Sequence, residues 1–206
     1  MMSPMSAEVI CMKSVKELAT RAMELRKRGL DTKEIAAELH LSTNTVEWLL
    51  TRGYEVEEAP KDVKIGWRSI GIYPYRISKI AEIMTDIILE EMEKREFTID
   101  SVVGVLINGI PYATFIAEEL GLEMIVYRPH PKREEGAFSS NYAHIEGKKV
   151  VLVDDVLSTG ETMKKAIEDI RNAGGIPKLV VVLVNKTSHD EVDGVPLRAL
   201  IRALPL

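Results

Sequence analysis

The sequence predicts an α/β domain with a parallel sheet, preceded by a small all-α unit. Two observations carry this prediction: three short segments with helical spacing fill the first fifty residues, and apolar runs alternate with amphipathic segments from residue 63 onward. That alternation is typical of parallel strands with helices on both faces of the sheet. We therefore place an N-terminal unit at 1–53, a linker at 54–62 and the larger domain at 63–206.

The composition bounds the partners and the compartment. The 206 residues carry a formal net charge of −5, so any contact with nucleic acid must be local rather than spread over the whole surface. The single cysteine, Cys11, excludes an internal disulfide and fits a reducing compartment. The sequence has no cleavable signal and no apolar run near the roughly 18 residues that span a bilayer. We therefore expect a cytoplasmic protein with no membrane partner.

Each of the three N-terminal segments begins with a residue that caps helices. Ser14 with Glu17, and Asp31 with Glu34, have the spacing of a capping box. Ser42 occupies the N-cap position of the third segment. These signals predict three short helices joined by tight connections.

The second and third of these helices have the spacing of a helix-turn-helix motif. Its inward-facing positions are apolar, and they are occupied by Ile35, Ala36, Leu39, Leu41, Val46 and Leu49. Ala36 is small where the two helices cross. His40 stands in the turn, where glycine is usual because the position favours a positive φ. This segment resembles the helix-turn-helix of bacterial and archaeal transcription regulators.

In a helix-turn-helix, the start of the second helix lies at the base edges of a DNA major groove. Here the candidate residues are Thr43, Asn44, Thr45, Glu47 and Trp48, while Lys33 and Arg52 are candidates for contacts to phosphate. The range 13–53 carries eight basic and six acidic residues, an excess that a dimer would double. The alternative is a three-helix packing unit that has no DNA partner or that serves dimerisation.

The larger domain is expected to alternate strands and helices. The helices are predicted at 77–95, 112–121 and 161–175, and the strands at 101–107, 123–128, 148–156 and, last, 177–186. Ligands of such sheets bind beyond the carboxyl ends of the strands. That rule selects three places: Asn108 with Gly109, the long loop after Arg128, and the range 154–162.

The stretch "VVLVDDVLSTGET" combines two carboxylates with a turn that suits phosphate. Strand 150–153 is expected to deliver Asp154 and Asp155 to the edge of the sheet, and the turn 158–160 leads into a helix. Backbone N–H groups at such a turn, with the helix N-terminus, form a nest for anions. Carboxylates repel phosphate, but they accept hydrogen bonds from vicinal hydroxyls or hold a Mg²⁺ ion. A sugar phosphate satisfies both halves of the motif.

Two other interpretations of this stretch are weaker. An apolar strand that ends in two aspartates also resembles the magnesium-holding strand of P-loop NTPases, but the chain contains no G-x-x-x-x-G-K-[ST] motif. The acidic pocket of a receiver domain would not need the Ser-Thr-Gly turn.

The stretch resembles the phosphoribosyl pyrophosphate (PRPP) signature of type I phosphoribosyltransferases. The likeness runs from about residue 65 to the C-terminus and is most similar to orotate phosphoribosyltransferases; "GVLINGIPYATFIAEELG" resembles their pyrophosphate loop and the helix after it. The resemblance implies that Asp154 and Asp155 hold the ribose hydroxyls, with Mg²⁺ as cofactor, and that Asn108 and Gly109 meet the pyrophosphate. The 5′-phosphate would be held by Leu157, Ser158, Thr159, Gly160, Glu161 and Thr162. Arg128 and Lys132 would supply positive charge.

The chain departs from this family where the chemistry of transfer occurs. The family's mobile loop has an Arg-Lys pair and a further Lys, but here Pro129 follows Arg128, and Lys132 and Arg133 come after "HP". Prolines stiffen a loop that should open and close. Asn108 stands where the family usually has a glycine, which predicts a less free backbone. His130, His144 and Trp67 are not assigned to the site; Trp67 is expected to pack in the core or in a hood over the ligand.

Two hypotheses of function follow. The favoured one is a DNA-binding transcription regulator whose larger domain senses PRPP or a related sugar phosphate, and this architecture resembles archaeal regulators that fuse the two parts. Such a regulator would bind a palindromic operator as a homodimer or tetramer. The alternative is an active orotate (or other base) phosphoribosyltransferase, in which Arg128, Lys132 and Asp155 would be catalytic. A bifunctional protein, or a PRPP-binding scaffold whose helical unit contacts protein, are further possibilities.

Overall fold

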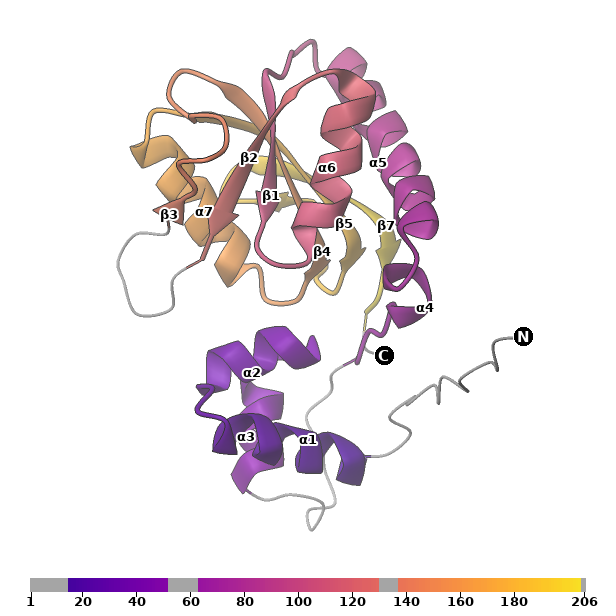
Figure 1. Cartoon of the computed structure of the whole chain (residues 1–206), viewed down its shortest axis with the longest axis vertical. Helices are drawn as coiled ribbons and strands as arrows, with labels where there is room; N and C mark the ends of the chain where they lie inside the picture. Colours follow the sequence, from indigo (N-terminus) through magenta and orange to yellow (C-terminus); the bar gives the residue numbers. More distant parts are fainter. Residues whose placement is uncertain (1–14, 52–62, 130–136, 205–206) are drawn as a thin grey trace, which may run out of the picture. The chain divides into compact units, whose positions relative to one another are not determined.

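The computed structural model describes residues 15–51, 63–129 and 137–204 (Figure 1). The chain divides into two compact units, Met1–Asp62 and Val63–Leu206, and each is described separately. The linker expected at 54–62 lies outside the described residues. Within the described part of the chain, no helix is long and apolar enough to cross a membrane.

The N-terminal unit consists of three helices: α1 (Val15–Lys27), α2 (Thr32–Leu39) and α3 (Thr43–Thr51). The capping box predicted for α2 is present. The Glu34 backbone N–H donates to the Asp31 carboxylate (2.9 Å), and the Asp31 N–H donates to the Glu34 carboxylate (2.7 Å). Each group satisfies a donor that the first turn of a helix leaves unpaired.

The turn between α2 and α3 has the predicted conformation. His40 ends α2 in the left-handed region (φ 53°, ψ 42°), which is the geometry that glycine usually supplies. The Ser42 hydroxyl accepts the Thr45 N–H (3.1 Å) and thereby caps α3. The predicted inward-facing residues are all buried, and with α1 they form one core: Ala19, Ala22, Leu25, Ile35, Ala36, Leu39, Leu41, Val46 and Leu49.

The larger unit contains one seven-stranded sheet, in the order β3-β2-β1-β4-β5-β7-β6. The five central strands are parallel, and only β3 and β6, at the two edges, run antiparallel to their neighbours. The strands are β1 (Ser101–Val105), β2 (Glu123–Arg128), β3 (Ala137–Phe138), β4 (Lys149–Leu157), β5 (Ile176–Asn185), β6 (Glu191–Val192) and β7 (Val195–Arg202). The predicted α/β class with a parallel sheet is confirmed.

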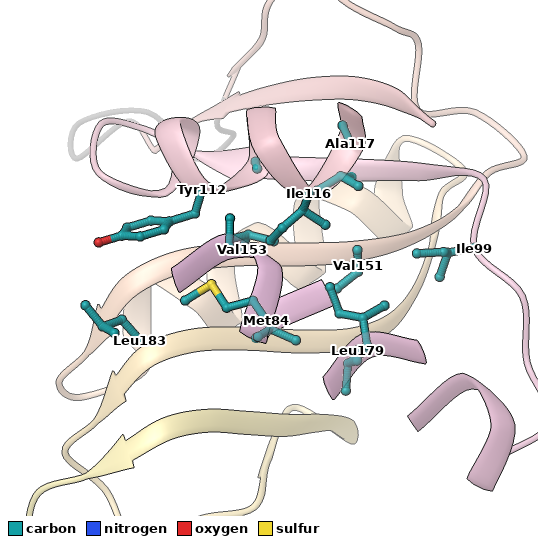
Figure 2. Packing of buried hydrophobic residues seen from close by; sticks show 14 of the residues in the cluster. Met84, Ile99, Tyr112, Ile116, Ala117, Val151, Val153, Leu179 and Leu183 are labelled. Atoms are coloured by element: carbon teal, nitrogen blue, oxygen red, sulfur yellow. The ribbon is translucent and has the colours of Figure 1, made fainter. Parts of the chain in front are cut away.

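Helices cover both faces of this sheet (Figure 1). The short α4 (Arg68–Gly71) leads into α5 (Pro74–Lys94), which packs with α6 (Gly109–Leu120) on one face, while α7 (Glu161–Asn172) covers the other. Successive residues of a strand point to opposite faces. Accordingly Val151 and Val153 of β4 belong to the core under α5 and α6, which Figure 2 shows, whereas Leu152 belongs to the core under α7.

The strands differ from the sequence predictions in two places. The strand at β5 is not the last one, because β7 pairs with it in parallel and β6 returns against β7 as a hairpin. In addition, β4 spans Lys149–Leu157, close to the predicted 148–156, so Asp154 and Asp155 lie inside the strand and not beyond an end at residue 153. Asp154 pairs with Val182 of β5, and this neighbour extends the strand beyond its apolar run.

Two buried carboxylates away from the sheet's carboxyl edge are satisfied by cations or hydroxyls. Glu91 of α5 accepts hydrogen bonds from Arg95 (2.6 Å) and Arg198 (2.8 Å). Although burial acts in the opposite direction, these two hydrogen bonds lower the pKa of Glu91. Asp169 of α7 accepts the hydroxyl of Tyr127 (2.7 Å), which ties α7 to β2. Burial and this hydrogen bond raise the pKa of Tyr127.

Candidate functional site

The carboxyl edge of the sheet brings together the segments that the sequence selected. Neighbouring parallel strands end at the same edge, and β2, β1 and β4 are consecutive in the sheet. Arg128 therefore ends β2 beside the loop that carries Asn108, and the range 154–162 follows on the other side of that loop. Arg128 is exposed. Lys132 and His130 lie outside the described residues.

The turn after β4 has the geometry of an anion site. Gly160 adopts a left-handed conformation (φ 82°) as the N-cap of α7, which begins at Glu161. Among the described residues, the backbone N–H groups of Thr159 and Gly160 form no hydrogen bond, whereas the Glu161 N–H donates to the Thr159 hydroxyl (3.4 Å). The first N–H groups of a helix have no partner within it. Ser158 is half-buried, and the Thr159 and Thr162 side chains are exposed. These donors can converge on a phosphate.

Leu157 contributes to this turn through its backbone only. Its side chain is buried in the core under α7, and its carbonyl accepts the N–H of Lys186 (2.8 Å). The side chain that the sequence placed in the phosphate loop therefore anchors the loop to the domain.

The loop after β1 lies directly against β4. Gly109 begins α6, and a Cβ atom at this position would be 2.2 Å from the carbonyl oxygen of Val153 and 3.0 Å from the Cα of Asp154. Only glycine permits this approach. The approach fixes the loop next to the segment of β4 that carries the two aspartates.

Asp155 is held on the face of the sheet that α5 and α6 cover. It is 4% exposed, and its Oδ2 atom accepts hydrogen bonds from Trp67 Nε1 (2.7 Å) and Asn108 Nδ2 (3.2 Å). The interpretation of Trp67 as core or hood packing is therefore incomplete, because its indole N–H reaches the acid pair directly. The two residues are 88 positions apart, and no local pattern connects them.

The sequence analysis predicted that Asn108 makes the backbone less free, but the structure shows a different effect. Its backbone has φ −79° and ψ −22°, a region open to any residue, so the absence of glycine there imposes no conformational cost. The asparagine instead provides a side-chain amide, and that amide donates to Asp155.

Asp154 points to the opposite side of the strand from Asp155 and is partly exposed. One of its oxygens accepts the Asp155 N–H (2.9 Å). Burial, and then repulsion from Asp155, raise the pKa of Asp154 well above its ordinary value. A hydroxyl donor or a cation at this position would relieve that repulsion.

The candidate DNA-binding residues are unequally accessible. Lys33, Asn44 and Glu47 are exposed, and Thr43 and Trp48 are half-buried. Thr45 is 8% exposed, and its hydroxyl forms a hydrogen bond with that of Ser42 (2.8 Å). Thr45 therefore belongs to the packing of the helical unit, and we remove it from the set that faces DNA. Arg52 lies outside the described residues.

These geometric features define a class of protein: a type I phosphoribosyltransferase fold that follows a small helical unit. The family model of the phosphoribosyl transferase domain matches residues 66–200 of this sequence. Among solved structures, orotate phosphoribosyltransferase from Aeropyrum pernix is similar with a TM-score of 0.54 and 23% identity, over 88% of this chain and 92% of that one. This likeness shows the fold.

The sequence relatives are more specific. A protein of Thermoplasma acidophilum named transcriptional regulator GfcR is 56% identical over 93% of this chain and 96% of its own length. A GfcR of Picrophilus torridus is 52% identical over 94% of this chain and 99% of its own length. The chain belongs to this family of GfcR transcriptional regulators, which carry a phosphoribosyl transferase domain.

Proposed function

We propose that this regulator binds operator DNA through α2 and α3 and senses PRPP, or a related sugar phosphate, at the carboxyl edge of its sheet. The observation that carries the proposal is the combination of a phosphate nest with an adjacent carboxylate pair. The nest at Thr159 and Gly160 precedes α7, and Asp154 and Asp155 lie a few residues before it in β4. A pentose that bears both a phosphate and a vicinal diol matches this arrangement.

Mg²⁺ fits the site as part of the ligand. The ion is usually held by one or two carboxylates together with phosphate oxygens and water. Asp154 offers a partly exposed carboxylate whose ionisation is disfavoured at rest, so a cation would stabilise its charged form. Asp155, whose Oδ2 already accepts two hydrogen bonds, is less suited to direct metal contact.

Calorimetric titration with PRPP and Mg²⁺ tests the ligand. We expect saturable binding to the wild type and a loss of at least tenfold for Asp154→Asn, because this change removes the charge but keeps the shape. Asp86→Asn, an exposed carboxylate on α5, serves as the matched control and should bind as the wild type does. The ligand assignment is wrong if the wild type shows no binding of PRPP or of ribose 5-phosphate.

DNA binding is the second half of the proposal, and the exposed Asn44, Glu47 and Lys33 support it. We expect a labelled fragment from upstream of the gene to bind, and PRPP to change the affinity through a shift in how two copies pair on a palindromic operator. Asn44→Ala should reduce specific binding by roughly 10-fold or more, since a good base contact contributes about 1–3 kcal/mol. Lys33→Ala should weaken binding to all DNA sequences alike. It should also reduce the slope of log K against log salt concentration by about one, which corresponds to one phosphate contact.

Glu38→Ala is the control for these changes, because Glu38 is exposed on α2 outside the proposed contact set. Equal loss of binding in Asn44→Ala and Glu38→Ala would contradict the proposed groove contact. A sedimentation measurement at the same protein concentration distinguishes a dimer from a tetramer. Binding that is insensitive to millimolar PRPP would separate the DNA-binding half of the proposal from the sensor half.

Residual transferase activity is the second candidate function, and the match of residues 66–200 to the phosphoribosyl transferase domain supports it. We expect little orotidine monophosphate from orotate, PRPP and Mg²⁺, because Pro129 replaces a lysine of the family's mobile loop directly after Arg128. A turnover above about 1 s⁻¹ lies in the ordinary range of enzymes and would make the transferase the favoured function.

A further inference from the structure

The carboxylate of Asp155 is engaged by two side chains of this unit. Its Oδ2 atom accepts one hydrogen bond from Trp67 and one from Asn108. A carboxylate oxygen offers about two lone pairs, so this atom is fully occupied. The bond from Trp67 is the shorter by 0.5 Å, from 3.2 to 2.7 Å, and it is therefore the main competitor for any hydroxyl that approaches Oδ2.

The indole of Trp67 is held between two other groups. Its ring packs over Gly71 of α4, where a Cβ atom would be 2.4 Å from the ring, and it lies 5.8 Å from the ring of Tyr112 at an angle of 57°. Aromatic pairs favour this tilted geometry. The position of Trp67 is thus defined by packing as well as by its hydrogen bond, so the ring and the segment that carries it move together.

Tyr112 adds an unsatisfied donor beside this contact. Its side chain is fully buried, and within the described part of the chain its hydroxyl has no hydrogen-bond partner. In Figure 2 the ring lies at the same end of the sheet as Leu183, which is near the carboxyl end of β5. A buried hydroxyl without a partner is costly. The described arrangement around Trp67 therefore leaves one buried polar group unsatisfied.

The chain order connects Trp67 to the rest of the protein. The two units divide between Asp62 and Val63, so Trp67 follows that boundary by a few residues. Its ring therefore belongs to the first residues of the larger unit. Asp155 lies at the ligand site, and one hydrogen bond therefore joins this site to the segment next to the boundary.

We propose that ligand binding changes the contact between Trp67 and Asp155, and that Trp67 thereby couples the ligand site to the start of the larger unit. In the ligand-free chain its indole N–H occupies Asp155, and a pentose displaces it when the vicinal diol takes the same carboxylate. This inference rests on the proposed function, because it requires a ligand that carries a diol. In this proposal the diol takes the same oxygen, Oδ2, so the two contacts exclude each other. The apparent affinity for the ligand is then the intrinsic affinity multiplied by the fraction of molecules in which the Trp67 contact is open.

Fluorescence tests the displacement directly. The chain has two tryptophans, so Trp48→Phe leaves Trp67 as the reporter. We expect PRPP with Mg²⁺, and also ribose 5-phosphate, to shift the Trp67 emission as the indole loses its carboxylate partner. The matched probe is 2-deoxyribose 5-phosphate, which keeps the phosphate but lacks one hydroxyl of the diol. It should leave the emission unchanged at concentrations that saturate the shift with ribose 5-phosphate.

The affinity of Trp67→Phe tests the competition and its sign. Phenylalanine keeps an aromatic ring against Tyr112 but has no N–H, so PRPP should bind about tenfold more tightly, the factor expected when a competing hydrogen bond to a charged group is removed. A residue that merely supports the fold would give weaker binding. The fluorescence experiment needs no change at Trp67, so it decides the matter if Trp67→Phe does not fold.

Three outcomes would overturn the inference. PRPP might bind to the wild type with no change in Trp67 emission, Trp67→Phe might bind PRPP equally or more weakly, or 2-deoxyribose 5-phosphate might produce the full shift. Each of these leaves the sensor proposal intact. By contrast, the absence of any heat on titration of the wild type with PRPP contradicts the proposed function itself, and the role of Trp67 is then rejected with it.

Discussion

Gly109→Ala is the change that most directly tests how the ligand site is built. The alanine Cβ would be 2.2 Å from the Val153 oxygen and 3.0 Å from the Asp154 Cα. An ordinary contact needs more than 3 Å, so α6 or β4 must move by roughly 1 Å. Both neighbours are backbone atoms of a central strand, and no side chain can rotate away to relieve the overlap.

The expected cost follows from that geometry. Overpacking of a core usually costs about 1–3 kcal/mol, and a clash with backbone lies at the upper end of that range. For a domain of this size, ~3 kcal/mol corresponds to a fall in Tm of roughly 10 °C. PRPP should also bind more weakly, since the same movement carries Asn108 away from Asp155 and separates the two sides of the site.

The assay is thermal unfolding followed by tryptophan fluorescence in a Trp48→Phe background, in which the signal comes from Trp67 of the larger unit. Gly66→Ala is the matched control, because a Cβ atom there would have nothing within 4 Å. We expect its Tm to remain within about 2 °C of the parent, as for most exposed substitutions. If Gly109→Ala melts as Gly66→Ala does, the close approach of α6 to β4 is wrong.

Three further predictions concern stability. Tyr127→Phe leaves the buried Asp169 without its hydroxyl donor and should cost about 1–3 kcal/mol in urea unfolding. Glu91 has a lowered pKa in the folded chain, so its ion pairs stabilise the fold at neutral pH, and this contribution is lost as the pH falls through that pKa. Glu91→Gln should therefore lower the free energy of unfolding by about 1–2 kcal/mol at pH 7, and its free energy of unfolding should depend less on pH below about pH 4. Asp31→Ala removes the α2 cap and should cost about 1 kcal/mol by circular dichroism, whereas Asp31→Asn should retain most of it.

Features with a local cause could be predicted from the sequence. The capping box of Asp31 and Glu34, the left-handed His40 and the buried strand before Asp154 each depend on residues a few positions apart. The anion turn at Gly160 is local in the same sense. Because the interactions that determine these elements span one turn or one strand, the pattern of residue types is enough to identify them.

The elements that escaped prediction depend on distant partners. The segment of β7 mixes arginines and apolar residues, and it becomes a strand because β5 offers a parallel edge. The contact between Trp67 and Asp155 bridges 88 positions and leaves no periodic pattern in the sequence.

The departures from the phosphoribosyltransferase pattern have a common physical meaning in this fold. In the sequence, Asn108 appears only as the loss of a glycine, but in the structure it gives Asp155 a donor and imposes no backbone cost. Trp67 supplies a second donor to the same oxygen. Two fixed donors hold the carboxylate in one orientation. A diol can bind to the same oxygen only if it replaces one of these donors. A sensor requires two states that differ by a few hydrogen bonds, and the two donors to Asp155 are the hydrogen bonds that the proposed exchange would change.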